Sequence, residues 1–293
     1  MKNFLTAILC FLLLLCSMVS CEHKAPTVQH IDFDTLSVDT ICPLFHSYDK
    51  PYCHLVIKMA KPVAETPVET LYAIEGFIST LPKDGSFETD ANGSVESMVN
   101  AYVKEYIMQY LKEGHDAIGQ HENDIEEQEA ASTWMNYEEN VEGKILYNAD
   151  GLVSYQVVTD SFTGGAHGNK TVDNGVFNVN TLDQISLADL FKDTSLDDLH
   201  SMLRNQLMIQ NDCKSMEELA EKGQFTSPSE IEATDNFFVN EDGITWTYDP
   251  YEIAPYSVGV VQISLTWDKI LPFLALDSPV MTLAKNSTHK ENS

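Results

Sequence analysis

The apolar residues of this chain change their spacing several times, and the order of these spacings limits the fold more than any other feature. In residues 53–60 every second residue is apolar, which is typical of a half-buried strand. In residues 94–111 apolar residues recur at every third or fourth position, which predicts a helix with its tyrosines in the core. A shorter helix is expected over residues 68–81. Because no βαβ unit repeats, the sequence predicts an α+β protein with antiparallel sheets and separate helices.

Two Asp-Gly pairs mark hairpin turns in the second half of the chain. Residues 133–148 and 152–161 are predicted to be strands that pair through the turn at Asp150-Gly151. The strands predicted within residues 237–248 pair through Asp242-Gly243 in the same way. The polar residues between these hydrophobic runs are therefore expected to form tight connections.

A further helix and a C-terminal strand are predicted around the second hairpin. Ser195 and Asp198 have the spacing of a capping box, and leucines at every third or fourth position continue the helix over residues 196–207. A strand over residues 258–265 and a short helix over residues 267–274 follow.

The N-terminus has the features of a lipoprotein signal. Lys2 supplies the positive charge, residues 4–19 are apolar, and the small Ser20 precedes Cys21. The apolar run is shorter than the roughly 20 residues that a bilayer-spanning helix needs, so an uncleaved anchor is the weaker alternative. We therefore expect Cys21 to carry a lipid and to anchor the protein in the cell envelope, at the outer membrane of a Gram-negative bacterium. The protein could lie on either the periplasmic or the outer face of that membrane.

The charge of the chain restricts its partners. A formal charge of −28 opposes binding to nucleic acid and to anionic membrane surfaces, so the lipid is expected to be the only membrane contact. The same charge favours the encounter with a cationic protein. The sequence contains no P-loop, Rossmann fingerprint, G-x-S-x-G elbow or H-E-x-x-H motif, and neither a cofactor nor a metal site is predicted.

Three cysteines lie beyond the signal segment and Cys21. In an oxidising compartment Cys42 and Cys53 could form a disulfide that closes a short loop. The sequence supports equally well that both cysteines remain unpaired thiols. Cys213 is then left without a partner. The two residues before it, Asn211 and Asp212, carry no positive charge that would activate a thiolate, so a catalytic role is not expected.

Residues 163–169 form a glycine-rich segment that displays one histidine. Gly164, Gly165 and Gly168 allow positive φ angles and close backbone approach, and they surround His167. A structural or protein-binding loop is the favoured interpretation. A catalytic or metal-binding loop is the alternative, but a metal would need two or three further ligands.

Several motifs together resemble a domain of unknown function found outside the cell in RsiV-type anti-sigma factors and PdaC-type peptidoglycan deacetylases. The motifs are Thr163-Gly164-Gly165-Ala166-His167-Gly168, Val176-Phe177-Asn178, Ile185-Ser186-Leu187-Ala188-Asp189-Leu190-Phe191, Phe237-Phe238-Val239, Asp242-Gly243-Ile244 and Tyr248-Asp249-Pro250-Tyr251-Glu252-Ile253-Ala254-Pro255-Tyr256-Ser257-Val258-Gly259. The resemblance covers residues 155–274, and the region before it corresponds in order to the companion domain of that pair.

The resemblance implies an α+β fold and, for the RsiV-type members, binding of lysozyme by the extracellular domain. We expect this chain to keep the binding module alone, without a sigma-factor-binding segment or a deacetylase domain. It would be a non-enzymatic envelope protein that binds a cationic protein such as lysozyme, or a peptidoglycan glycan. The expected ligand contacts are Gly164, Gly165, His167, Gly168, Asn169, Tyr248, Tyr251 and Tyr256. A wall-polymer hydrolase that uses His167, and an envelope scaffold without a soluble ligand, are the alternatives.

These expectations divide the chain into five parts. They are a signal peptide (1–20), a tether (21–46), an N-terminal α+β domain (47–150), a C-terminal α+β domain (151–276) and a flexible tail (277–293). The two α+β parts are expected to be either two small domains or one fused two-part unit.

Overall fold

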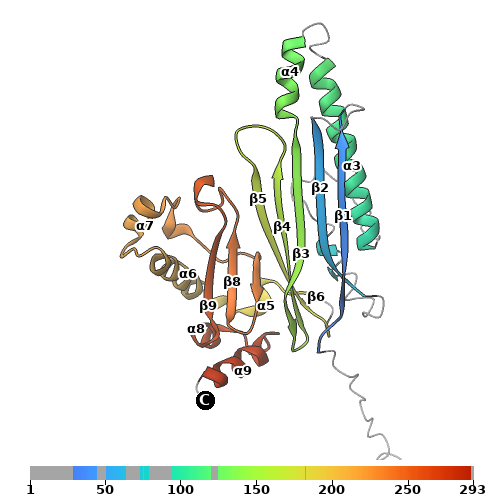
Figure 1. Ribbon diagram of the computed structural model, residues 1–293. Helices are drawn as coiled ribbons and strands as arrows, with labels where there is room; N and C mark the ends of the chain where they lie inside the picture. The colour runs from blue at the N-terminus through green and yellow to red at the C-terminus, as the bar shows by residue number, and fades with distance from the viewer. Residues whose placement is uncertain are drawn as a thin grey trace, which may run out of the picture.

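The computed structural model describes residues 29–44, 51–63, 73–74, 76–78, 94–119, 125–181 and 183–291. These residues form a six-stranded sheet, a smaller three-stranded sheet and several separate helices (Figure 1). The predicted α+β class with two parts is thus confirmed. The signal segment and Cys21 lie outside the described residues, and no helix within them is long and apolar enough to cross a membrane.

The elements have the following bounds. The larger sheet contains β1 (Phe33–Pro43), β2 (Tyr52–Pro62), β3 (Tyr137–Ala149), β4 (Leu152–Phe162), β5 (Asn169–Asn178) and β6 (Asp183–Gln184), in that spatial order. The smaller sheet contains β7 (Phe237–Val239), β8 (Gly243–Tyr248) and β9 (Val261–Thr266). The helices are α3 (Val95–Gly119), α4 (Ile125–Trp134), α5 (Leu187–Leu190), α6 (Leu196–Gln210), α7 (Met216–Gly223), α8 (Trp267–Ile270) and α9 (Met281–Glu291).

Helix α3 covers one face of the larger sheet (Figure 1). Its tyrosines Tyr102, Tyr106 and Tyr110 are buried among the alternate residues of β2, of which Leu55 is fully buried. This confirms the predicted strand, the predicted helix and the core position of the tyrosines. The described residues 73–74 and 76–78 are helical, as expected for the shorter helix, and the rest of residues 68–81 lies outside the described part.

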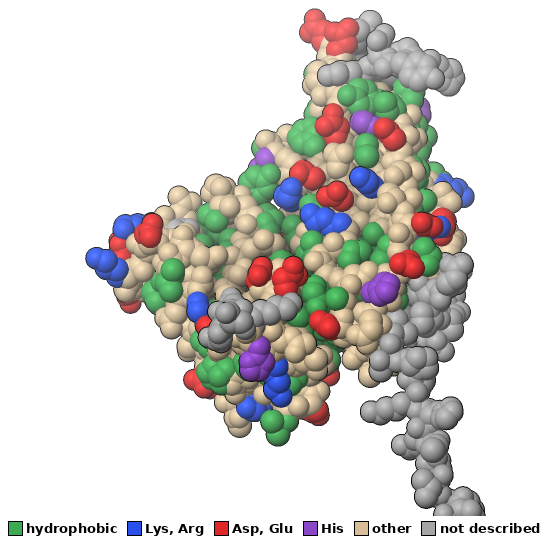
Figure 2. Space-filling view, turned by 60° about the horizontal axis from the view of Figure 1, so that its bottom comes forward, with side chains coloured by type: hydrophobic (Ala, Val, Ile, Leu, Met, Phe, Trp, Pro, Cys, Tyr) green, Lys and Arg blue, Asp and Glu red, His purple; other side chains and the backbone are tan. Residues whose placement is uncertain are grey.

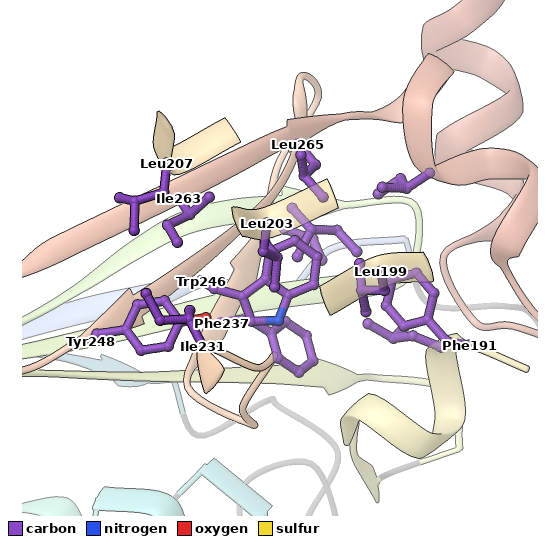
Figure 3. Close-up of a cluster of buried hydrophobic side chains, with 14 of the residues drawn as sticks. Phe191, Leu199, Leu203, Leu207, Ile231, Phe237, Trp246, Tyr248, Ile263 and Leu265 are labelled. Carbon is purple, nitrogen blue, oxygen red and sulfur yellow. The ribbon is translucent and has the colours of Figure 1, made fainter. Parts of the chain in front are cut away.

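The smaller sheet packs against the other face of β4 and β5, and α6 covers its outer side. Figure 3 shows Leu199, Leu203 and Leu207 of α6 directed toward Trp246 and Ile263, at the centre of this second core. The protein is therefore built in four layers: α3, the larger sheet, the smaller sheet and α6.

Strand β4 lies at the middle of these layers and is buried on both faces. Val153, Tyr155 and Val157 belong to the core under α3. The polar residues between them, Ser154 and Gln156, are buried against the second sheet. Alternation of apolar and polar residues is typical of a half-exposed strand, but here the polar face is covered as well.

Side chains replace a β-ladder where the two sheets meet, and we call these contacts the polar seam (Ser154, Asn174, Asn236, Thr247 and Asp249). The amide of Asn236 accepts from the backbone N–H of Asn174 at 2.9 Å and donates to the carbonyl of Val172 at 2.8 Å. Ser154 accepts from Val239 N–H at 3.1 Å and donates to Val239 O at 2.7 Å. The seam thus satisfies backbone groups at the edges of β5 and β7 that burial would otherwise leave unpaired.

Further seam bonds join side chain to side chain and side chain to backbone. The side-chain amide of Asn174 donates to Asn236 Oδ1 at 2.7 Å and to Thr247 Oγ1 at 3.1 Å. Asp249 accepts from the backbone N–H of Val172 at 2.8 Å. The seam therefore runs from the end of β7 to the end of β8.

Two expectations for the chain ends are wrong. Residues 33–43 of the expected tether form edge strand β1, because Leu36, Val38 and Cys42 alternate with polar residues and pack on the first core. The expected flexible tail contains α9, since Val280, Leu283 and Ala284 are buried in the second core.

Two expectations about pairing are also modified. The sheets are antiparallel except between β2 and β3, which pair in parallel because the chain from one to the other runs through α3 and α4. The division expected between residues 150 and 151 falls on the β3–β4 turn inside the larger sheet, so hydrogen bonds cross it. The turn itself is as predicted, with positive φ at both Asp150 and Gly151.

The predicted capping box at Ser195 is not formed. Ser195 occupies the N-cap of α6, but its side chain makes no capping hydrogen bond. The corresponding contact occurs earlier, where the backbone N–H of Ser186 donates to Asp189 at 2.8 Å at the start of α5.

We expect Asn236→Ala to lower the free energy of unfolding by about 1–3 kcal/mol, because backbone groups of Val172 and Asn174 lose their partner at a covered edge. Urea unfolding of the two proteins measures the difference. Asn205→Ala, on the exposed face of α6, is the matched control and should change stability by less than about 0.5 kcal/mol. Equal effects of the two substitutions would show that the seam does not stabilise the fold.

Candidate functional site

The glycine-rich segment forms the connection between β4 and β5, and we call it the glycine loop (residues 163–169). Gly164 and Gly165 have φ angles of +88° and +89°, which side-chain-bearing residues rarely adopt. A Cβ atom at Gly164 would also lie 2.8 Å from the backbone oxygen of Trp134. Glycine is therefore required where this loop passes over the end of α4.

The connection between β8 and β9, here called the tyrosine loop (residues 249–260), lies beside the glycine loop. It is fixed at its first residue, because Asp249 accepts from Val172 N–H on β5 at 2.8 Å. Inside the loop, the backbone N–H of Tyr251 donates to Ala254 O at 2.9 Å, and Asp249 N–H donates to the Glu252 carboxylate at 2.8 Å. The carboxylates of Asp249 and Glu252 are thus both used to shape the loop.

Tyr251 has a strained backbone. Its φ angle is +73°, an outlier for a bulky residue, and its side chain is 66% exposed. Strained conformations of this kind cost roughly 1–3 kcal/mol and are concentrated at functional sites. Tyr251 therefore combines a strained backbone with an exposed aromatic side chain.

The two loops bring three aromatic rings together, and we call them the aromatic cluster (His167, Tyr251 and Tyr256). The rings of His167 and Tyr256 stack with centroids 3.9 Å apart and an angle of 21° between their planes. The rings of Tyr251 and Tyr256 are 5.9 Å apart, and the Tyr251 hydroxyl lies 3.5 Å from His167 Nε2. The fold therefore assembles residues that the sequence separates by more than 80 positions.

The contacts of His167 define its tautomer. Nδ1 lies 2.8 Å from the carbonyl of Gly168, and because a carbonyl only accepts, Nδ1 carries a proton and donates it. In the neutral ring Nε2 is then an acceptor directed toward the Tyr251 hydroxyl. Neither contact involves a carboxylate, and the described residues contain no group of three or more His, Cys, Asp or Glu that could hold a metal ion.

The remaining predicted contact residues have different positions. Asn169 is exposed at the start of β5, and Gly165 is exposed in the glycine loop. Gly168 packs on the β4 backbone, where a Cβ would lie 2.8 Å from Ser161 O. Tyr248 is only 1% exposed and donates its hydroxyl to Glu232 O at 2.7 Å, and burial raises its pKa above the usual value. Tyr248 thus belongs to the second core and lies outside the exposed cluster.

Trp134 lies beside Gly164 of the glycine loop, and the sequence did not indicate it as a candidate residue. It ends α4 with 46% of its surface exposed, and a Cβ on Gly164 would lie 3.3 Å from its ring. The only sequence signal was a tryptophan after an acidic, weakly amphipathic segment, which does not indicate a neighbour 30 positions away.

Charge does not single out another site on the face shown in Figure 2. Acidic side chains are dispersed there, with basic and hydrophobic side chains between them. Near the aromatic cluster, Asp249 and Glu252 already accept backbone hydrogen bonds. The surface formed by the glycine loop and the tyrosine loop is therefore distinguished by its aromatic rings.

Family comparisons agree with this architecture. Residues 85–170 match the family model described as Deacetylase PdaC, and residues 188–268 match that of Protein of unknown function (DUF3298). The resemblance to the PdaC-like and RsiV-like families is thus confirmed, although the glycine-rich motif at residues 163–168 lies within the PdaC match. No curated protein matches the sequence.

Two solved structures have the same fold. A DUF3298-family protein of Bacteroides fragilis superposes with a TM-score of 0.77 at 24% identity, covering 89% of this chain and 99% of that one. A DUF3298-family protein of Pseudomonas aeruginosa gives 0.56 at 16% identity, covering 84% and 96%. At these identities the likeness establishes the fold.

We expect Tyr251→Gly to leave stability unchanged or to raise it by up to about 1 kcal/mol, because glycine adopts a positive φ without the Cβ clash. Tyr251→Ala keeps the Cβ and should give no gain. Thermal unfolding of both variants tests this. A loss of more than about 1 kcal/mol in Tyr251→Gly would show that the side chain serves packing and that its backbone is not strained.

Proposed function

We propose that this chain is a non-enzymatic, lipid-anchored protein of the cell envelope that binds a partner through the aromatic cluster. The partner is a cationic protein such as lysozyme, or a glycan of the cell wall. The observation that carries the proposal is the assembly of His167, Tyr251 and Tyr256 at the surface from two separate loops.

The geometry supports binding because exposed aromatic residues on supported loops are typical interaction anchors. Tyr251 is held outward at the expense of backbone strain, and Tyr256 is held by its stack on His167. Both loops are anchored to β5 and its neighbours, so little conformational freedom has to be lost on binding.

Two ligand chemistries fit the cluster. A lysine or arginine of a basic protein would be attracted to tyrosine faces, and the formal charge of −28 would speed its approach. The apolar face of a sugar ring would stack on the same tyrosines, while its hydroxyls could bond to the Tyr251 hydroxyl and His167 Nε2.

A wall-polymer hydrolase that uses His167 is less well supported. A general base needs a partner that orients it and a second reacting group, yet the contacts of His167 are its own loop carbonyl and a tyrosine hydroxyl. These contacts hold the ring in place for stacking. An unchanged wall-degrading activity in His167→Ala would eliminate this alternative.

We expect Tyr251→Ala to weaken binding at least tenfold, which corresponds to the loss of about 1.4 kcal/mol from one interface anchor. Calorimetric titration with hen egg-white lysozyme and, separately, with soluble peptidoglycan fragments measures this at low and physiological salt. Leu276→Ala is the control, because Leu276 is 90% exposed and lies away from the aromatic cluster. It follows α8, at the end of β9 opposite to the tyrosine loop (Figure 1).

Saturable binding of one probe that survives physiological salt and weakens in Tyr251→Ala alone is the expected result. Binding that disappears with salt and is equal in both variants would mean that net charge alone attracts the probe. The absence of binding to either probe would remove both ligand classes and favour a scaffold.

A further inference from the structure

Cys42 and Cys53 face each other across the first two strands. The antiparallel register of β1 and β2 pairs them directly, three positions after the Asp39–Val56 pair. Directly opposed residues in such a pair have Cα atoms about 4.5–5.5 Å apart, which lies within the span of about 4.4–6.8 Å that a disulfide requires. Both thiols are free in this structure.

We infer that Cys42 and Cys53 form a disulfide bond in the exported protein, and that reductants reach this bond only through the sulfur of Cys42. The inference uses the export that the N-terminal segment predicts, and it is independent of the ligand proposed for the aromatic cluster.

The two sulfurs differ in accessibility. Cys53 is 1% exposed and points into the first core, where Tyr110 of α3 is buried, whereas Cys42 on edge strand β1 is only partly buried. Burial raises the pKa of Cys53 to about 12, and burial also raises the pKa of Cys42. Because the thiolate is the reactive form, the folded dithiol reacts slowly, and the bond forms most readily before α3 covers β2.

The reaction is a thiol–disulfide exchange with a protein disulfide of the oxidising compartment. The Cys42 thiolate attacks that disulfide, forming a mixed disulfide and releasing one thiolate of the oxidant. The Cys53 thiolate then attacks Cys42 Sγ and releases the second. Two cysteine thiols lose two protons and two electrons, and the oxidant is reduced to a dithiol.

The bond would fasten the edge of the larger sheet. Among the strands that the structure describes, β1 pairs with β2 alone and is the first in the chain after the N-terminal segment that carries Cys21. A covalent link at the Cys42 end restricts the separation of β1 from the sheet and shortens the loop that the unfolded chain can explore.

Cys213 supplies an internal control. It is buried in the second core beside α6 and α7, on the far side of both sheets from Cys53. It should therefore stay a free thiol in the same molecule.

The test is alkylation of the full-length protein extracted from the envelope under denaturing, non-reducing conditions, followed by chymotryptic cleavage and mass spectrometry. Cleavage after Phe45 or Tyr48 separates Cys42 from Cys53. We expect a linked peptide pair, lighter by two hydrogens than the two thiol peptides and separated by reduction, with Cys213 alkylated. A second measurement compares reduction by dithiothreitol with and without urea, and we expect reduction to be at least tenfold slower in the folded protein.

Alkylation of both Cys42 and Cys53 in the extracted protein would overturn the inference, as would a link from either residue to Cys213. Equal reduction rates with and without urea would overturn the restricted access. In Cys42→Ser, Cys53 should be found as a free thiol that is alkylated only after unfolding.

Discussion

The contact on which the rest of the structure depends is the polar seam between the two sheets. A sheet edge that is covered by another layer must find partners for its backbone groups, and β5 and β7 find them in the side chains of Asn236 and Ser154. Because these bonds are directional, they fix the small sheet at one position on the large one. Hydrophobic contact is not directional, so alone it would fix the position of the small sheet less specifically.

The position of the small sheet decides where the surface aromatic residues meet. The glycine loop leads into β5 and the tyrosine loop leaves β8, and Asp249 ties the start of the second loop to Val172 just after the first. Displacement of the small sheet by one residue would separate Tyr256 from His167. The candidate site therefore depends on the packing between the two sheets, and neither sheet with its loops forms the site alone.

The sequence predicted those elements whose signal is local. Regular spacing predicted β2 and α3, and Asp-Gly predicted both hairpin turns, since their patterns depend on neighbouring residues. It did not predict edge strand β1, in which polar residues alternate with apolar ones. It also did not predict the burial of Ser154, which results from the packing of the smaller sheet on β4. Both candidate loops were identified by composition. Their contact, the place of Tyr248 in the core and the neighbouring Trp134 depend on residues distant in the sequence, so no local pattern reveals them.

The central claim is that the polar seam positions the aromatic cluster, and the ring protons of His167 report on it directly. In a protein with labelled histidines, stacking on Tyr256 should shift the His167 resonances upfield, and Tyr256→Leu should abolish this shift and so assign it. The account predicts that Asn236→Ala, while folded, reduces the upfield shift because the two loops are no longer held together. An upfield shift of the same size in Asn236→Ala and in the unaltered protein would contradict it.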